Sequence, residues 1–380
     1  MKNWMKLGLV WFAVGLLFIA LTLRAEAVLK VRTTERPVVQ AAILLDTSGS
    51  MSGLIEQAKS ELWKIINELS SSRKGGAVPL VQVALYEYGK SSLPASEGYL
   101  RMILPLNTDL DKVSEELFAL TTNGGDEYCG QVIQSACQGL KWSGSNQDYK
   151  VIFIAGNEPF TQGTVDYKKS CSETISKGII VNTIFCGNYN EGLNTGWKDG
   201  AELADGRYLN IDHNARAIQI DAPQDKEIAL LGNQLNRTYL AYGAAGVDGS
   251  ARQKEQDKNA QTLAPAIAAE RVVAKSSAGY LNSSWDLIDA HREGKVKIED
   301  LKESELPAEM RRMTGPEKKA FLEKTGKERR QIQETVNRLN DERKKYIAAQ
   351  MKNQGTDSSF GAAVVKVVRE QAVAKNFRFE

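Results

Sequence analysis

One acid and two hydroxyl residues, each two positions apart, form the first group in the chain that could bind a metal ion. Asp-Thr-Ser-Gly-Ser at 46–50 follows directly on the apolar run 38–45. Carboxylate and hydroxyl oxygens are hard ligands that suit Mg²⁺, Ca²⁺ or Mn²⁺, and alternate residues of a tight loop can turn toward one ion. Asp46, Ser48 and Ser50 are therefore candidate metal ligands. The alternative is a serine-rich turn from a strand to a helix, with Asp46 as a cap.

Apolar runs alternate with amphipathic stretches along this part of the chain, which is the pattern of a doubly wound α/β sheet. Several runs are apolar throughout, as expected when helices cover both faces of a mostly parallel sheet. We expect strands at 39–45, 81–86, 102–106, 151–155, 179–186 and 207–211, with helices at 53–69, 110–120, 131–140, 165–177 and 197–204. In such sheets ligands bind outside the carboxyl ends of the strands, which is where Asp46 lies.

Two further polar stretches supply loops at the same edge. Thr-Thr-Asn-Gly-Gly-Asp-Glu at 121–127 lies between two expected helices, and Ala-Gly-Asn-Glu-Pro at 155–159 follows an expected strand. The order and spacing of the three loops resemble the metal-ion-dependent adhesion site (MIDAS) of von Willebrand factor A (vWA) domains, in which D-x-S-x-S is the first loop. The resemblance covers about residues 38–213 and implies a Rossmann-like fold. The sequences at 124–130 and 153–160 look like those of an exported bacterial subgroup of vWA proteins.

The chain departs from the family pattern in the second and third loops. The family usually presents a threonine after a Gly-Gly pair, where this chain has Asp126, and an aspartate in the third loop, where it has Gly156. Asp126 can restore a second negative charge, with Thr122, Glu127 and Glu158 as additional metal or ligand-loop residues, because divalent affinity depends strongly on the carboxylate count. The alternative for Asp126 is a cap on the helix that follows.

The resemblance implies a non-enzymatic, adhesion-type protein of the cell envelope. A divalent cation, Mg²⁺ first with Ca²⁺ or Mn²⁺ as alternatives, would keep open positions, and an acidic side chain of a protein ligand would complete its shell. The sequence lacks a phosphate-binding glycine loop, a metal-hydrolase histidine pair and a serine nucleophile with its base. The competing hypothesis is a structural envelope component that acts through its C-terminal helices, with the vWA domain as a metal-free scaffold.

The N-terminal segment has the pattern of a signal peptide at residues 1–27. Lys2 and Lys6 precede the apolar stretch 7–23, and Ala-Glu-Ala at 25–27 offers a cleavage site. We therefore expect export to the periplasm or cell surface, with a membrane contact only if this segment stays uncleaved as an anchor. The formal net charge of +2 gives no support for a nucleic-acid partner.

Four cysteines in an exported chain predict disulfide bridges, because an oxidising compartment permits them. Cys129 and Cys137 would lie about 12 Å apart if both are on one helix, which is too far for a bridge between them. Each would then pair elsewhere, with Cys171 and Cys186 as the remaining candidates. Buried free thiols are the alternative.

The chain beyond the vWA domain, which we place at 38–240, is expected to be helical. A Gly- and Ala-rich linker at 241–250 precedes a helical, coiled-coil-like region at 251–380. Apolar residues follow a three-and-four pattern across the charged stretch 317–350. This pattern fits a helix that folds back on its neighbours, or a dimer. The apolar cluster at 360–377 would close a helical bundle or dock into another protein, and the sequence leaves both open.

Overall fold

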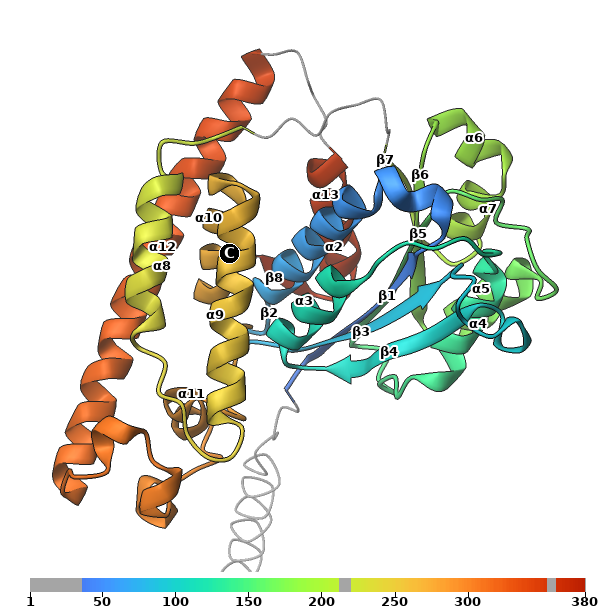
Figure 1. Cartoon of the computed structure of the whole chain (residues 1–380). Helices are drawn as coiled ribbons and strands as arrows, with labels where there is room; N and C mark the ends of the chain where they lie inside the picture. The colour runs from blue at the N-terminus through green and yellow to red at the C-terminus, as the bar shows by residue number, and fades with distance from the viewer. Residues whose placement is uncertain (1–35, 212–219, 354–359, 380) are drawn as a thin grey trace, which may run out of the picture. The chain divides into compact units, whose positions relative to one another are not determined.

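A six-stranded sheet in the order β4-β3-β1-β5-β6-β7 forms the centre of the fold (Figure 1). The structure is a computed structural model that describes residues 36–211, 220–353 and 360–379. All neighbouring strands are parallel except β4, which runs antiparallel to β3. The strands are β1 (Val38–Asp46), β3 (Leu80–Tyr88), β4 (Leu100–Asn107), β5 (Tyr149–Gly156), β6 (Ile179–Cys186) and β7 (Tyr208–Ile211).

Helices cover both faces of this sheet, which confirms the expected doubly wound α/β class. One face carries α2 (Ile55–Ser70), α3 (Leu110–Ala119) and α13 (Phe360–Ala374). The other carries α4 (Cys129–Gly139), α5 (Tyr167–Ser176), α6 (Tyr189–Asn194) and α7 (Trp197–Glu202). Consecutive residues of a strand point to opposite faces, so Ile43 joins the first core and Leu44 the second. This alternation explains why the strands are apolar throughout.

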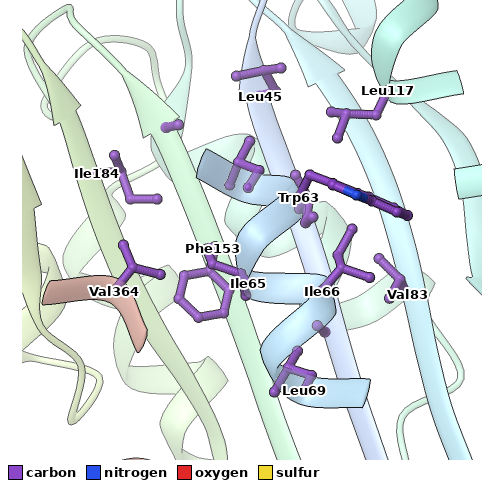
Figure 2. Packing of buried hydrophobic residues seen from close by; sticks show 14 of the residues in the cluster. Leu45, Trp63, Ile65, Ile66, Leu69, Val83, Leu117, Phe153, Ile184 and Val364 are labelled. Atoms are coloured by element: carbon purple, nitrogen blue, oxygen red, sulfur yellow. The ribbon is translucent and has the colours of Figure 1, made fainter. Parts of the chain in front are cut away.

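The core beneath α2 holds that helix against the middle of the sheet. Figure 2 shows Ile65 and Ile66 of α2 beside Phe153 of β5 and Val83 of β3, with Val364 of α13 on the other side of Phe153. All five side chains are buried. Burial of each such side chain is worth about 1.5–3 kcal/mol. The packing therefore fixes the strand whose carboxyl end carries Asp46.

The remaining helices form a second group that packs on α3. They are α8 (Asp225–Asn236), α9 (Gly246–Leu263), α10 (Pro265–Ser276), α11 (Leu287–Arg292) and α12 (Gly315–Asn353), joined by 3₁₀ turns at Ile298–Asp300, Glu303–Glu305 and Ala308–Met310. Ile332, Val336 and Leu339 of α12 are buried against α8 and α10. The apolar residues of the three-and-four pattern are thus buried within the chain, because α12 folds back on its neighbours.

Buried ion pairs connect this helical group to α3. Arg271 of α10 lies 2.6 Å from Asp111 of α3 and 2.9 Å from Asp257 of α9. Lys275 lies 2.6 Å from Asp257, and Tyr280 donates a hydrogen bond of 2.5 Å to Asp111. A charge that is buried in this way must keep its partner, because an unpaired buried charge is costly. These pairs therefore favour one position of α9 and α10 on the sheet domain.

The last residues of the chain return to the sheet domain. Val364 and Val368 of α13 are buried in the core beneath α2, and β8 (Phe377–Phe379) pairs antiparallel with β2 (Ser72–Lys74). Gln371 exchanges two side-chain hydrogen bonds with Asn182 of β6, at 2.8 and 2.9 Å. The sequence left open whether this segment closes a helical bundle or docks into another protein. The structure shows neither, because the segment packs on α2 and the sheet. The boundaries drawn at 38–240 and 251–380 stay predictions.

The described residues contain no helix that is both long and apolar enough to cross a membrane. The signal peptide expected at 1–27 lies outside the described residues, and so does His213 at the end of the stretch that resembles a vWA domain.

Candidate metal centre

The first loop brings its acid and both hydroxyls together at the end of β1. Asp46 is fully buried, and its Oδ1 accepts a hydrogen bond of 2.7 Å from the Ser48 amide. The hydroxyls of Ser48 and Ser50 lie 2.8 Å apart, and Ser50 donates to Asn157 Oδ1 at 2.9 Å. Asp46 Oδ2 is buried without a hydrogen-bond partner. A buried acceptor without a partner is costly, and a cation would satisfy it.

The second loop turns Glu127, rather than Asp126, toward this group. Glu127 is 4% exposed, and its amide donates a hydrogen bond of 2.6 Å to Gln162 Oε1. A Cβ atom on Gly89 would lie 2.7 Å from Asp46 Oδ1 and 2.8 Å from Glu127 Cγ, so both acids crowd the same glycine. Glycine suits position 89 for two reasons: there is no room for a Cβ atom, and the backbone φ of +79° favours glycine. The sequence named Glu127 only as an additional residue.

Asp126 and Thr122 lie outside this group. Asp126 is exposed, and Tyr128 donates a long hydrogen bond of 3.4 Å to its Oδ2. Asp126 does not cap the following helix either, because Tyr128 is the N-cap of α4 and no side chain bonds there. The Thr122 hydroxyl lies 3.1 Å from that of Ser52. Both residues therefore belong to the rim of the candidate centre.

The third loop has no room for the acid that the family usually places there. A Cβ atom at position 156 would lie 2.5 Å from Tyr88 Oη and 3.1 Å from Asp46 Oδ2. Tyr88 is fully buried and donates a hydrogen bond of 3.0 Å to the Ala155 carbonyl. The tyrosine thus occupies the space that a side chain at 156 would need. Glu158, two residues on, is half-buried, and its carbonyl accepts a hydrogen bond of 2.8 Å from the Trp197 indole.

Burial raises the pKa of both buried acids. Burial raises the pKa of Asp46 from 3.8 to about 7, with a smaller contribution from the charge of Glu158. Burial also raises the pKa of Glu127 from 4.5 to about 8, and the charge of Asp46 adds to this rise while a hydrogen bond with Ser48 opposes it. Without a counter-charge Asp46 is therefore about half protonated near pH 7 and Glu127 is mostly protonated. A cation between them would favour both carboxylates.

Buried charged residues that the sequence reasoning missed hold the loops from beneath. The Thr47 hydroxyl lies 3.2 Å from Glu87 Oε2, and Glu87 in turn pairs with Arg101. Lys59 of α2 donates a hydrogen bond of 2.7 Å to the Leu120 carbonyl, where the second loop begins. The sequence carried a signal for both residues, because Lys59 interrupts the apolar side of its helix and Glu87 is a charged residue near the end of a buried strand.

The disulfide prediction is wrong for all four cysteines, which are free and buried. Cys129, Cys137 and Cys171 pack in the same core as small apolar side chains. The Cys129 thiol lies 3.7 Å from the Tyr88 hydroxyl, and burial raises its pKa well above the usual range. Cys186 ends β6, and burial raises its pKa as well. These thiols are therefore poor nucleophiles and poor ligands as they stand.

An open cleft of about 560 Å³ adjoins the first and third loops. Ser50 and Asn157 line it on the side of the candidate centre, together with Glu158. Asn188, from the turn after β6, and Glu191, from α6, line it as well. No motif in the sequence marks either of these two residues as part of a site.

The comparisons with known proteins identify the domain. Residues 42–196 match the family described as the von Willebrand factor type A domain. The chain contains a vWA domain. No curated protein matches the chain.

Solved structures similar to this vWA domain include BatB from Bacteroides thetaiotaomicron, with 18% identity, a TM-score of 0.36, and coverage of 46% of this chain and 90% of that chain. The SpRpn10 VWA domain has 16% identity and a TM-score of 0.37, with coverage of 47% and 90%. Proximal thread matrix protein 1 from the mussel byssus, with a zinc-occupied MIDAS motif, has 11% identity and a TM-score of 0.35, with coverage of 47% and 43%.

Proposed function

We propose that the chain is a non-enzymatic binding protein whose vWA domain uses a divalent cation to capture a protein ligand. The family match supports this, because vWA domains often mediate protein binding through such an ion. The observation that carries the proposal is Asp46 Oδ2, a buried carboxylate oxygen without a partner, next to a second buried acid at Glu127. Such a pair is unfavourable alone and favourable around a cation.

Asp46, Ser48, Ser50 and Glu127 would hold the ion, with Mg²⁺ as the first expectation and Ca²⁺ or Mn²⁺ as alternatives. The described residues contain no cluster of three or more His, Cys, Asp or Glu side chains placed to hold a metal. The set therefore relies on hydroxyl oxygens and water beside its two carboxylates, as Mg²⁺ sites commonly do. When bound, the ion would offer an open position to an acidic side chain of the partner. Glu158 remains a spare oxygen donor.

The rim of the centre would carry the rest of the contact. Asp126 is exposed beside Tyr128, and Thr122 lies beside Ser52, so these side chains face the space that a partner would enter. We further propose that the protein acts in the periplasm or at the cell surface, which rests on the signal-peptide pattern at 1–27.

Calorimetric titration of the metal-stripped protein with Mg²⁺ tests the proposal. We expect saturable binding that Asp46→Ala abolishes, because the substitution removes the acid with the orphaned oxygen. The matched control is Asp199→Ala, which removes a half-exposed aspartate on α7. Absence of binding in the wild type, for Mg²⁺, Ca²⁺ and Mn²⁺ alike, would contradict the proposal and favour a metal-free scaffold.

A further inference from the structure

Two carboxylates without an ion-pair partner among the described residues line the cleft beside the candidate centre. They belong to Glu158 and Glu191. The cleft is open and has a volume of about 560 Å³, enough for a long side chain. Two carboxylates that share an open cleft attract a cationic group.

A second observation places a ligand next to this cleft. Asp46 Oδ2 is fully buried, has no hydrogen-bond partner, and would lie 3.1 Å from a Cβ on Gly156. Ser50, whose hydroxyl would help to hold the proposed ion, lines the cleft, and so does Asn157, which accepts a hydrogen bond from Ser50. The cleft therefore adjoins the place where the proposed ion and the partner's acid would sit.

The walls of the cleft are held in place before any ligand arrives. The Asn188 side chain accepts hydrogen bonds from the amides of Asn190 and Glu191, at 2.9 and 3.3 Å, which fixes the start of α6. The Trp197 indole fixes the carbonyl of Glu158 on the opposite side. Preorganised walls reduce the entropy cost of binding.

An exposed aromatic residue lies on α6 with Glu191, outside the residues that line the cleft. Tyr189 is 53% exposed, and its ring centroid lies 5.3 Å from that of Tyr208. A lysine or arginine side chain gains from an aromatic face as well as from a carboxylate. Charge and aromatic exposure on one helix thus favour the same kind of ligand group.

We infer that this cleft recognises a lysine or arginine side chain, and that the protein ligand therefore carries a basic residue close to the acid that reaches the ion. The inference rests on the proposed function, because the acid must be held at the centre for its neighbour to enter the cleft. Glu191 and Glu158 select the basic residue by charge.

Labelled heptapeptides of known sequence serve as the probe. Each peptide has an aspartate at its centre and alanine elsewhere, except at one variable position. This position lies one to three residues from the aspartate and holds Lys, Gln or Glu. Fluorescence polarisation in Mg²⁺ at low salt measures their affinities for the full-length protein. We expect at least one position at which the Lys peptide binds about threefold or more tightly than the Gln peptide. The Glu peptide should bind more weakly than both, and salt should reduce the difference.

Substitutions in the cleft show whether the preference comes from these acids. Glu191→Gln should reduce the Lys-to-Gln ratio toward one, and Glu191→Lys should invert it in favour of the Glu peptide. Glu202→Gln is the matched control, because Glu202 is an exposed acid on α7 outside the cleft lining. Its ratio should equal that of the wild type.

The inference is overturned if no position prefers Lys over Gln, if no peptide binds, or if the preference survives in Glu191→Lys. Mg²⁺ calorimetry on the same proteins separates this failure from that of the proposed function. Metal binding without a basic preference refutes the inference alone, whereas loss of metal binding in the wild type refutes the proposed function.

Discussion

Gly156→Ala should destabilise the protein, because the added methyl group meets Tyr88. Its Cβ would lie 2.5 Å from the Tyr88 hydroxyl oxygen, where contacts under 3.0 Å force something to move. Tyr88 cannot swing away cheaply, since it is fully buried and its hydroxyl donates to the Ala155 carbonyl at 3.0 Å. Overpacking of this kind costs about 1–3 kcal/mol. The φ of Gly156 is not in the left-handed region, so the cost is steric.

A double-mutant cycle with Tyr88→Phe isolates that contact. Tyr88→Phe alone removes the hydrogen bond to the Ala155 carbonyl and the long contact with the Cys129 thiol, and should cost about 0.5–1.5 kcal/mol. The phenylalanine lacks the oxygen that Gly156→Ala would meet, so the double variant should be more stable than the sum of the single changes predicts, by about 1 kcal/mol or more.

Urea unfolding of the four proteins gives the free energies of unfolding. Strict additivity, or a Gly156→Ala variant as stable as the wild type, would refute the view that Tyr88 fills the place of the third-loop acid. Gly144→Ala is the control, because a Cβ there meets nothing within 4 Å.

Three further predictions concern the candidate centre and its support. Glu127→Gln should weaken Mg²⁺ binding in calorimetry by about tenfold or more, because it removes one of two carboxylates, whereas Asp126→Asn should leave it unchanged; the reverse order would return the role to Asp126. In EDTA, thermal unfolding should show stability falling between about pH 5 and 8, because the folded-state pKa values of Asp46 (about 7) and Glu127 (about 8) lie above their ordinary values. The stability that the two protonated acids contribute is complete below about pH 4 and is lost as pH rises through the folded-state pKa values. A stability that stays flat or rises over this range would contradict the prediction. Arg271→Ala should lower the free energy of unfolding in urea by about 3–5 kcal/mol, because it leaves its buried partner on α3 unpaired. Lys258→Ala removes one residue of an exposed ion pair and should change the free energy of unfolding by less than about 1 kcal/mol. Similar effects of the two substitutions would show that the buried pairs do not hold the helices.

Local pattern was enough to predict the sheet. The six strands of the central sheet follow apolar runs that a parallel sheet covered on both faces requires, as Ile43 and Leu44 illustrate. The sequence also predicted that the acid and the two hydroxyls of the D-x-S-x-S loop lie together, because all three belong to one stretch of five residues. The short strands β2 and β8 were not predicted, since each has only three residues and they pair over about 300 residues of chain.

The second and third loops could not be predicted from their own residues. The choice between Asp126 and Glu127 depends on Gln162, which holds the Glu127 amide, and on the space beside Gly89. The absence of an acid at Gly156 depends on Tyr88, which comes from another strand. Contacts between distant segments decided both, and no spacing rule encodes them.

The cysteines and the C-terminal segment show the same limit. Composition and an expected compartment predicted bridges, but Cys129, Cys137 and Cys171 pack as apolar core residues. The apolar cluster at 360–377 was recognised as a surface that needs a partner, yet the partner is α2, almost the whole length of the chain away.

An anomalous-difference map from crystals grown in Mn²⁺ tests most directly whether an ion lies between the two buried acids. We predict one strong peak within coordination distance of Asp46 Oδ2 and the Glu127 carboxylate, close to the Ser48 and Ser50 hydroxyls and remote from Asp126. A peak at Asp126 would move the site to the rim of the second loop. Diffraction from saturated crystals without a peak at Asp46 would contradict a metal-dependent vWA domain in this chain.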